Sequence, residues 1–361
     1  MPHQYEHAEG NGLATLAAVA SGDKFLSGDR CLEIYRLMVR SRIMEERMIK
    51  MSKSGEGYFW IGGPGEEAFN VALGLQVKKG EGPDFDYLHL HYRNSATLVA
   101  MGMPLIDGIR QMAMTFTDPH SRGRNFVGHF ALPKWNVLPV SSVIGVGWVK
   151  APGTAHVQRR HGGDSITIVT GGDAGTAEGD FNSCMIWSTR PGNELPVLMI
   201  VMNNGFGIST PACTQHSESR IIDRGKPFGI PGEVVDGNDP IASWYAIERA
   251  MEFVRTKRRP YMIEALVSRL YGHSSSSGAL RVKGEQDCIP HFEHKLREAG
   301  IVDEAMITQI HDEAVAECEA ALEQTLTEPK PTAEDVRKFT YASSDVDAVY
   351  PDDYTGLPNG D

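Results

Sequence analysis

Two polar side chains follow two short apolar runs of the sequence, where they could act together on a ligand. Asp173 comes soon after the run 165–170, and Asn204 closes the run 196–204. A segment of helical character, 181–189, lies between them, which indicates a strand, a helix and a second, parallel strand. Ligands of such sheets collect at the carboxyl ends of the strands, so we expect the two side chains to meet at one rim.

The chemistry that this pair supports is the binding of a cation and a phosphate. One carboxylate, one amide and a nearby backbone carbonyl form an all-oxygen set of low charge, which suits magnesium completed by diphosphate oxygens and water. Gly171, Gly172 and Gly175 let the backbone approach a phosphate, and the helix start near Glu178 offers free amide groups. The segment GGDAG alone also fits an ordinary β-turn, but its combination with the NN pair is much more specific.

The segments around this pair resemble a known cofactor motif. GGDAGTAEGDF and VMNNGFGIST resemble the thiamine diphosphate motif, in which GDG is followed by NN after one crossover helix. More narrowly, they are similar to the alpha subunits of the decarboxylating component of branched-chain 2-oxo acid dehydrogenase complexes, and the similarity runs from about residue 30 to about residue 330. It implies that magnesium is held by Asp173, Asn204 and the backbone carbonyl of Phe206.

The same resemblance assigns further residues to the cofactor. The segment HYR matches the one that contacts the cofactor diphosphate in this family, and a tyrosine hydroxyl and an arginine fork are suitable donors to anionic oxygens. Taken alone, HYR would be a solvated strand end. The segment VSSVIGVG matches the stretch that packs around the cofactor. The implied cofactor-binding set is His91, Tyr92, Arg93, Ser142, Ile144, Asp173, Ala174, Gly175, Asn204, Phe206 and His273.

One histidine and two apolar residues complete the implied site. The segment RLYGHSSSS matches the active-site loop whose histidine the family uses beside the reacting carbon, which makes His273 the expected catalytic residue. A histidine with a pKa of about 6.5 exchanges protons near neutrality, and its charged form would attract phosphate and carboxylate; alone, it would be read as solvated. Phe59 and Ile61 fall where the family lines its substrate pocket, although ordinary core positions explain them equally well.

Three of the departures from the family pattern affect the cofactor site and the histidine loop. Ala174 replaces the last glycine of GDG, which is tolerated if its φ is negative. Met202 stands where some relatives carry an arginine for the diphosphate, which leaves more of that role to Arg93 and the metal. Residues 276–278 read Ser-Ser-Gly instead of Ser-Asp-Asp, and we expect fewer carboxylates to weaken the ordering of the loop around the histidine.

The resemblance implies a 2-oxo acid dehydrogenase that decarboxylates its substrate and transfers the acyl group to a lipoyl carrier. The branched-chain type, acting on 3-methyl-2-oxobutanoate, is expected, with thiamine diphosphate and Mg²⁺ as cofactors. In this family the carboxylate that activates the aminopyrimidine comes from a beta subunit, and 361 residues with a single sheet pattern leave no room for a second such domain. The expected partners are therefore a beta subunit, in an α2β2 heterotetramer, and a lipoyl-bearing acyltransferase.

Three other functions compete with this prediction. A pyruvate or acetoin dehydrogenase alpha subunit shares the motif and differs in the pocket. A non-catalytic interaction subunit of the same fold would bind the cofactor poorly because of Ala174 and Met202. A nucleotide-binding dehydrogenase is disfavoured because no GxGxxG opens a βαβ unit and no P-loop lysine follows the glycines.

The elements that must position these residues alternate as in a doubly wound, mostly parallel α/β sheet with helices on both faces, helical additions and extended termini. We expect an N-terminal arm at 1–28, a thiamine-diphosphate-binding domain at 29–328 and a C-terminal tail at 329–361. Further strands are predicted where apolar and polar residues alternate or where apolar residues run together, and helices are predicted where apolar residues recur at helical spacing. The strands lie at 86–91, 232–235 and 261–267, and the helices begin at Asp29 and Glu66 and span 244–254 and 303–325.

Composition narrows the class of protein. A formal net charge of −12, from 35 basic and 47 acidic residues, argues against nonspecific binding to nucleic acid or to an anionic membrane. No apolar run has the length that crossing a bilayer requires. Five cysteines without a CxxC pair argue against a zinc site and a disulfide framework. Because the first residues lack the features of a secretory or mitochondrial leader, we expect a cytoplasmic location.

Overall fold

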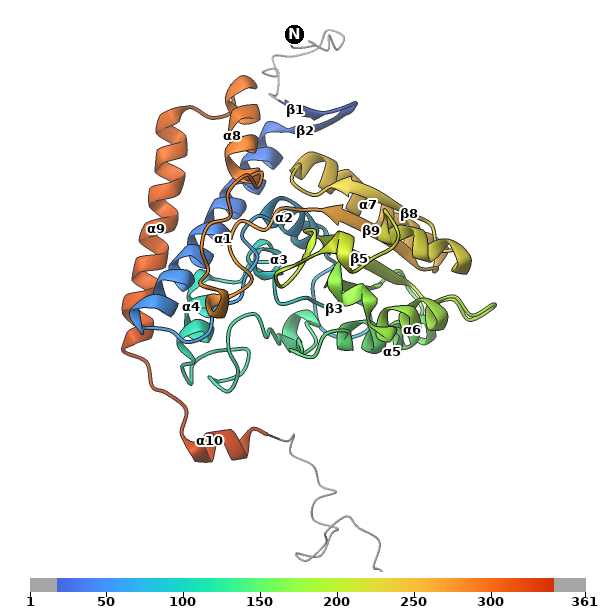
Figure 1. The fold of residues 1–361 in the computed structure, drawn as a ribbon, viewed down its shortest axis with the longest axis horizontal. Coiled ribbons are helices and arrows are strands. Elements are labelled where there is room, and N and C mark those ends of the chain that lie inside the picture. Colours follow the sequence, from blue (N-terminus) through green and yellow to red (C-terminus); the bar gives the residue numbers. More distant parts are fainter. Residues whose placement is uncertain (1–17, 341–361) are drawn as a thin grey trace, which may run out of the picture.

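A five-stranded parallel sheet forms the centre of the molecule (Figure 1). The computed structural model describes residues 18–340. Every pairing within this sheet is parallel, and Gly172 at the end of one central strand lies opposite Met202 of its neighbour. In spatial order the strands are β3 (Tyr87–His89), β4 (Thr167–Gly172), β5 (Val197–Asn203), β9 (Tyr261–Leu266) and β8 (Gly232–Asp236).

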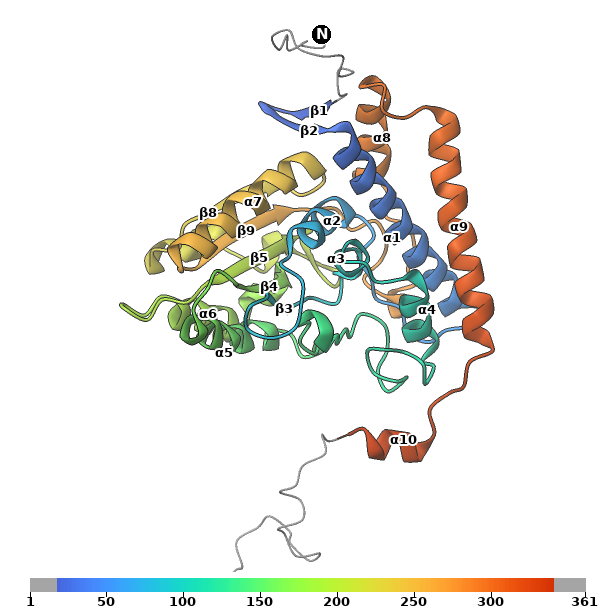
Figure 2. The ribbon, with the colours of Figure 1, turned by 180° about the vertical axis from the view of Figure 1, so that it is seen from behind.

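Helices cover both faces of this sheet, as the two views in Figures 1 and 2 show, and the predicted doubly wound α/β fold is confirmed. Alternate residues of β5 enter different cores: Leu198 and Ile200 face one set of helices, and Met199 faces the other. The first set is α2 (Glu67–Gln76), α3 (Ser95–Ala100) and α7 (Pro240–Lys257), and the second is α5 (Val146–His161) and α6 (Gly179–Ser188).

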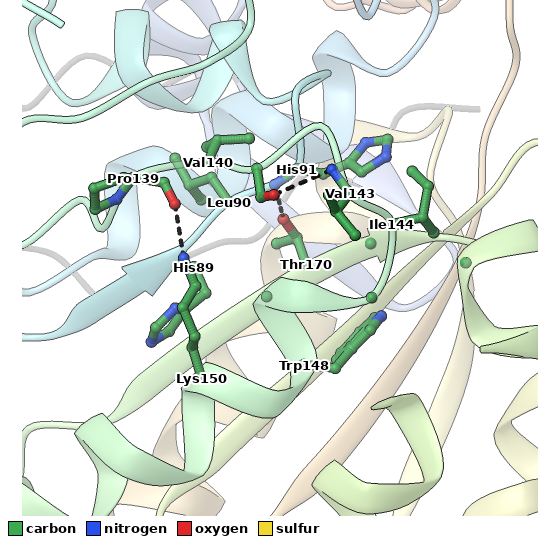
Figure 3. A pocket seen from close by; sticks show the side chains of 15 residues that line it. His89, Leu90, His91, Pro139, Val140, Val143, Ile144, Trp148, Lys150 and Thr170 are labelled. Carbon is green, nitrogen blue, oxygen red and sulfur yellow. Dashed lines mark hydrogen bonds between the residues drawn. The ribbon is translucent and has the colours of Figure 1, made fainter. Parts of the chain in front are cut away.

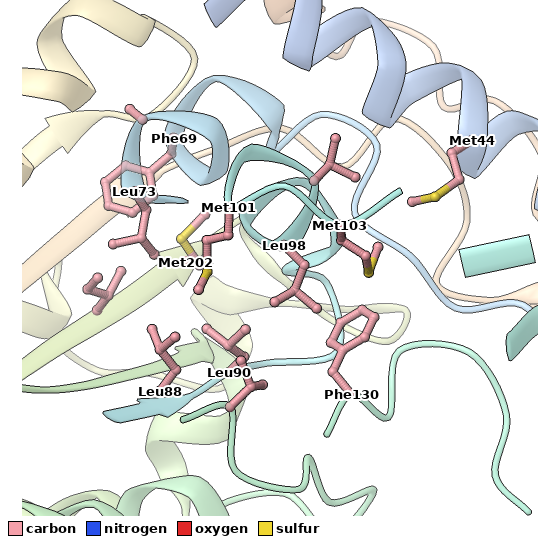
Figure 4. Close-up of a cluster of buried hydrophobic side chains, with 14 of the residues drawn as sticks. Met44, Phe69, Leu73, Leu88, Leu90, Leu98, Met101, Met103, Phe130 and Met202 are labelled. Carbon is pink, nitrogen blue, oxygen red and sulfur yellow. The ribbon is translucent and has the colours of Figure 1, made fainter. Parts of the chain in front are cut away.

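The core between the sheet and α2 and α3 is rich in leucine and methionine (Figure 4). Leu88 of β3 and Met202 of β5 contribute to it from the sheet, and Leu73 and Leu98 contribute from the helices. All four side chains are at most 1% exposed. Burying a side chain of this size contributes about 1.5–3 kcal/mol, so this cluster is a main source of the stability of the sheet.

A second helical layer stands against one end of the sheet. The long helix α1 (Gly28–Ser54) starts at an N-cap, Ser27, and ends at Gly55 in the left-handed conformation that glycine favours. It packs beside α9 (Glu304–Leu326), with α4 (Leu105–Ala113) and α8 (Cys288–Glu298) next to the pair (Figures 1 and 2). No helix of residues 18–340 is long and apolar enough to cross a membrane.

Four elements differ from the expectations drawn from the sequence. Within the expected arm, β1 (Ala18–Ser21) and β2 (Lys24–Ser27) form an antiparallel hairpin. Helix α5 was not expected. Within the expected tail, α10 (Ala333–Lys338) forms, and it begins at a capping box between Thr332 and Asp335. The remainder of the arm and tail, 1–17 and 341–361, lies outside the described residues, and the division into domains stays a prediction.

Candidate active site

Four neighbouring strands deliver the expected site residues to one rim of the sheet. The chain leaves β3 towards Arg93, β4 towards Asp173, β5 towards Asn204 and β9 towards His273, and these strands are adjacent in this order. Since all four are parallel, their carboxyl ends lie at the same edge. The predicted meeting of the two central strand ends is therefore confirmed, and two flanking strands add cationic and imidazole groups.

A cleft of about 570 Å³ opens at this rim. Every residue that the sequence assigned to the site lines it, so the structure brings together segments far apart in the chain. These residues are Phe59, Ile61, His91, Tyr92, Arg93, Ser142, Ile144, Asp173, Ala174, Gly175, Asn204, Phe206 and His273. Further lining residues that sequence reasoning missed include Phe126, His129 and Gln215.

Asp173 is a buried carboxyl group with unused hydrogen-bonding capacity. It is 1% exposed, and its Oδ2 atom accepts no hydrogen bond within the described structure. Burial raises its pKa above the ordinary value. An unpaired buried carboxylate is costly, and a bound cation would remove that cost. Ala174, which follows it, is not among the residues with positive φ, so the condition for tolerating alanine there is met.

The two asparagines at the end of β5 make different contacts. Asn203 donates to Glu264 Oε1 at 2.7 Å, which secures the strand end, while Asn204 Oδ1 accepts from the Phe206 amide at 3.2 Å and lines the cleft. Gly207 must be a glycine, because a Cβ atom there would lie 2.7 Å from the Cβ of Ala174. The turn after β5 is thereby held against the turn after β4.

The described residues contain no group of three or more His, Cys, Asp and Glu side chains that could hold a metal ion. The oxygen set formed by Asp173, Asn204 and the Phe206 carbonyl has a single carboxylate, so it fits a cation that shares its charge with phosphate oxygens. The unpaired Oδ2 atom of Asp173 supports this use of the rim.

The segment after β3 is fixed by backbone contacts. The His91 amide donates to Thr170 Oγ1 at 2.7 Å, and the Gly62 carbonyl accepts from Arg93 Nη1. The rings of His91 and Tyr92 lie 3.8 Å apart between centroids. Burial, followed by the charges of Arg93 and His273, lowers the pKa of His91 to about 3, so its ring is neutral at pH 7.

A smaller cavity of about 40 Å³ adjoins the cleft behind His91 (Figure 3). His91, Ile144 and Gly175 line both spaces. Lys150 of α5 donates to the Pro139 carbonyl at 2.8 Å, and the Val143 amide donates to the Ser141 hydroxyl (Figure 3). Helix α5 thus supports the loop that carries Ser142 and Ile144 into the cleft.

The side chains of His273 and Arg93 are in contact at the wall of the cleft. Arg93 Nη2 lies 3.1 Å from Nδ1 of the ring, and because a guanidinium only donates, Nδ1 accepts and the neutral ring carries its proton on Nε2. Burial, then the charges of Arg93 and Arg269, lower the pKa of His273 to about 4. The expectation that this ring titrates near neutrality therefore does not hold for the chain without a ligand.

Serine side chains hold the loop around His273, in which residues 276–278 lack the two carboxylates of the family pattern. Two hydrogen bonds join Ser275 to Trp60. The Ser275 amide donates to the Trp60 carbonyl at 2.8 Å, and the Ser275 hydroxyl accepts from the Trp60 amide at 3.1 Å. Ser274 and Ser277 form a capping box around the short turn. Trp60 Nε1 in turn donates to the buried Glu45 at 2.8 Å. The expected weakening of the loop is compensated by serine contacts.

Aromatic side chains form one wall of the cleft. The rings of Phe59 and Phe126 meet edge to face at 5.0 Å, and Phe126 meets His129 at 4.3 Å. Nε2 of His129 contacts the Ser142 hydroxyl. Ile61 is 7% exposed and lines the same space. Of the two interpretations of Phe59 and Ile61, the pocket position is the one that this geometry supports.

The chain is similar to known proteins over most of its length. A family model described as the dehydrogenase E1 component matches residues 35–334. The 2-oxoisovalerate dehydrogenase subunit alpha of Bacillus subtilis is 28% identical over 88% of this chain and 97% of its own length. A mitochondrial 2-oxoisovalerate dehydrogenase subunit alpha 2 of Arabidopsis thaliana is 31% identical over 72% of this chain and 53% of its own length. The pyruvate dehydrogenase E1 component subunit alpha of Bacillus subtilis is 27% identical over 88% of this chain and 83% of its own length.

Proposed function

The chain belongs to the dehydrogenase E1 component family, a family that depends on thiamine diphosphate, and we propose that it is the alpha subunit of a branched-chain 2-oxo acid dehydrogenase. The substrate is 3-methyl-2-oxobutanoate or a close homologue, and the cofactors are thiamine diphosphate and Mg²⁺. The membership of the family agrees with the resemblance of the motifs. The type of 2-oxo acid is the finer part of the proposal, since relatives of both the branched-chain and the pyruvate type are similar to this chain.

The single observation that carries the proposal is the unpaired Oδ2 atom of Asp173 beside Asn204 at the rim of the cleft. A buried carboxylate without a partner is unfavourable in a chain that binds nothing there. In this position Asp173, Asn204 and the Phe206 carbonyl would hold Mg²⁺. Tyr92 and Arg93, from the neighbouring strand end, would bind the diphosphate oxygens.

When bound, the cofactor supplies the nucleophilic carbon and the electron sink for loss of CO2. The chain supplies orientation and proton control. His273 holds its proton on Nε2 because Arg93 donates to Nδ1 at 3.1 Å. An anionic ligand would offset the repulsion from Arg93 and raise the pKa of His273 from about 4 towards neutrality, where the ring can exchange a proton with the substrate. Phe59, Ile61 and Phe126 would exclude water around an aliphatic tail.

The proposal includes partners that supply what this chain lacks. A beta subunit would contribute the carboxylate that activates the aminopyrimidine, in an α2β2 heterotetramer, and a lipoyl-bearing acyltransferase would receive the acyl group. The cleft is open at the rim, with Ile144 44% and Ile208 60% exposed beside it, so a second chain can cover it. We propose a cytoplasmic location.

The experiment is lipoamide-dependent decarboxylation by the chain co-expressed with its beta subunit. With thiamine diphosphate and Mg²⁺ present, 3-methyl-2-oxobutanoate should give a kcat/KM at least about tenfold above that of pyruvate, the factor expected when a pocket distinguishes one or two methylene groups. A preference for pyruvate would reassign the chain to the pyruvate type. No saturable binding of thiamine diphosphate would support a non-catalytic subunit instead.

A further inference from the structure

Two nitrogen atoms of the Arg269 guanidinium lack a hydrogen-bond partner among the described residues. Arg269 follows β9 and precedes His273 by one short segment, and within residues 18–340 its Nε and Nη1 atoms are inaccessible to water and make no hydrogen bond. Arg93 in the same region binds Gly62 and His273. Buried arginine donors are almost always paired, because an unmet charged donor costs more than a neutral one. An anion that residues 18–340 do not supply would satisfy these two nitrogen atoms.

Arg269 is not part of the cleft lining, but its neighbour Phe206 is, which places Arg269 next to the proposed metal ligands. Its guanidinium lies over the Phe206 ring, 5.1 Å from the centroid, and Phe206 is the residue whose carbonyl we propose as a ligand of the cation. The carboxylates of Asp173 and Glu285 attract its charge, while Arg93 repels it and burial opposes it. An arginine nevertheless keeps its proton in proteins. Arg269 thus lies between an attracting carboxylate, Asp173, and a repelling guanidinium, Arg93.

The strand order places the two arginines on either side of the proposed metal ligands. Arg93 extends from β3, Asp173 and Asn204 follow the two central strands, and Arg269 follows β9. A diphosphate carries several negative charges and offers paired oxygens that match the planar fork of arginine. A single substrate carboxylate would satisfy one guanidinium but not two.

On the basis of the proposed function, we propose that Arg269 is a second guanidinium ligand of the cofactor diphosphate, which it binds together with Arg93 from the opposite side of the metal site. The stacking on Phe206 orients the guanidinium and shields it from water before the ligand arrives. Arg269 also lies four residues before His273, so occupation of the diphosphate site would bring negative charge close to both. The cofactor end of the cleft would then be completed from the loop that carries the catalytic histidine.

The test compares three variants of the full chain in its complex with the beta subunit. Arg269→Met removes the charge, Arg269→Lys keeps it without the fork, and Arg160→Met removes an exposed charge of α5 as a matched control. Calorimetric titration at fixed Mg²⁺ measures the Kd of thiamine diphosphate, and inorganic pyrophosphate serves as competitor. We expect Arg269→Met to weaken both ligands by about 10- to 100-fold, Arg269→Lys to recover part of that loss, and Arg160→Met to bind within about twofold of the parent chain.

Thermal unfolding without cofactor separates ligand binding from a structural role. Because Arg269→Met removes an unpaired buried charge, the melting temperature of the cofactor-free complex should rise by about 2 °C, while the increase produced by thiamine diphosphate should shrink. A fall in the cofactor-free melting temperature, or a Kd of Arg269→Met within about twofold of the parent, would overturn the proposal.

Two further outcomes are distinguishable. An unchanged Kd with a raised KM for the 2-oxo acid would assign Arg269 to the substrate carboxylate and also overturn the proposal. If the parent complex binds no thiamine diphosphate, the proposed function fails first, and the role of Arg269 fails with it. Binding by the parent with normal binding by Arg269→Met, in contrast, leaves the proposed function intact.

Discussion

Two groups of buried charges in this chain differ in how completely they are paired. In the first, which we call the Arg42 cluster, Arg42 of α1 binds Glu67 through Nε at 2.6 Å and Nη2 at 2.9 Å, and binds Asp287 through Nη1 at 2.9 Å. The Gly65 amide donates to Glu67 as well, at 2.7 Å. The Arg42 cluster joins α1, α2 and α8, and its charges satisfy one another.

The second group, which lies in and next to the cleft, presents the opposite condition. Several polar atoms here are buried without a hydrogen bond in the part of the chain that the structure describes. They are Asp173 Oδ2, both carboxyl oxygens of Glu66, His91 Nδ1 and two nitrogen atoms of Arg269. Burial raises the pKa of Glu66 to about 8. A folded chain tolerates such groups where a ligand restores the lost interactions, and otherwise pairs them. The difference between the two groups thus separates ionisable groups that pair with one another and hold the fold from ionisable groups that await a ligand.

Glu45 lies between these two groups. It stands one turn after Arg42 on α1, accepts from Trp60 and Ser95, and is 3% exposed. Burial is the main cause that raises its pKa to about 7; Glu67 of the Arg42 cluster raises it further, and Arg93 of the cleft lowers it. Its protonation therefore reports on both groups.

The largest expected effect comes from breaking the Arg42 cluster. Arg42→Met leaves Glu67 and Asp287 buried without their cation, which should lower the free energy of unfolding by about 3–5 kcal/mol. Urea unfolding measures this loss. Arg40→Met is the matched control, because its pair with Glu317 is partly exposed and should cost less than about 1 kcal/mol. Equal losses in the two variants would mean that the Arg42 cluster contributes no more than a surface pair.

Removing the unpaired carboxylate of the cleft should weaken cofactor binding without lowering stability, the reverse of the effect expected for Arg42→Met. Asp173→Asn is expected to leave the stability of the cofactor-free chain unchanged or higher by about 1 kcal/mol, since a desolvated carboxylate is lost. The Kd of thiamine diphosphate in the presence of Mg²⁺ should rise by about 100-fold or more. Glu178→Gln changes an exposed carboxylate that lines the same cleft and should leave the Kd within about threefold. A destabilised Asp173→Asn with normal affinity would contradict the contrast between the two groups.

Glu45 offers a test of intermediate size through pH. Its pKa in the folded state, about 7, lies above that of the unfolded chain, about 4.5, so the folded state binds more protons between these values and stability falls as pH rises through about 7. Glu45→Gln removes this loss. The stability of Glu45→Gln relative to the parent should therefore increase by about 1–3 kcal/mol from pH 5 to pH 8, measured by urea unfolding at each pH. A difference that does not change with pH would place the ionised form in the folded chain.

Much of the fold and of the cofactor end of the cleft could be predicted because strand ends are local signals. Asp173 and Asn204 each follow an apolar run, and the rule that parallel strands share a rim brings them together. Helix α5 was missed because its sequence includes Gly147, Pro152 and Gly153 and shows no apolar stripe. It is formed by packing on the sheet rather than by its own periodicity.

The wall of the cleft and the state of its charges were not accessible to such reasoning. Phe126 and His129 lie in a long loop without periodicity, and contacts distant in sequence, such as the Phe116 amide donating to the Pro329 carbonyl at 2.8 Å, hold that loop in place. The missing partner of Arg269 and the neutral ring of His273 depend on which atoms meet in space. A pattern of residue types does not contain that information.

The smallest expected effect concerns the aromatic wall, where the cleft has satisfied contacts like those of a core. Phe126 packs on both Phe59 and His129, so Phe126→Leu should enlarge the space for a substrate tail without exposing a polar group. We expect the ratio of kcat/KM for 4-methyl-2-oxopentanoate over 3-methyl-2-oxobutanoate to rise by about three- to tenfold, the range that one methylene group allows, with the Kd of thiamine diphosphate unchanged. The control is Phe116→Leu, at the start of the same loop and outside the cleft lining. If the ratio stays constant while the Kd rises, Phe126 supports the cofactor end, and the division of the cleft into a charged end and an apolar end would have to be redrawn.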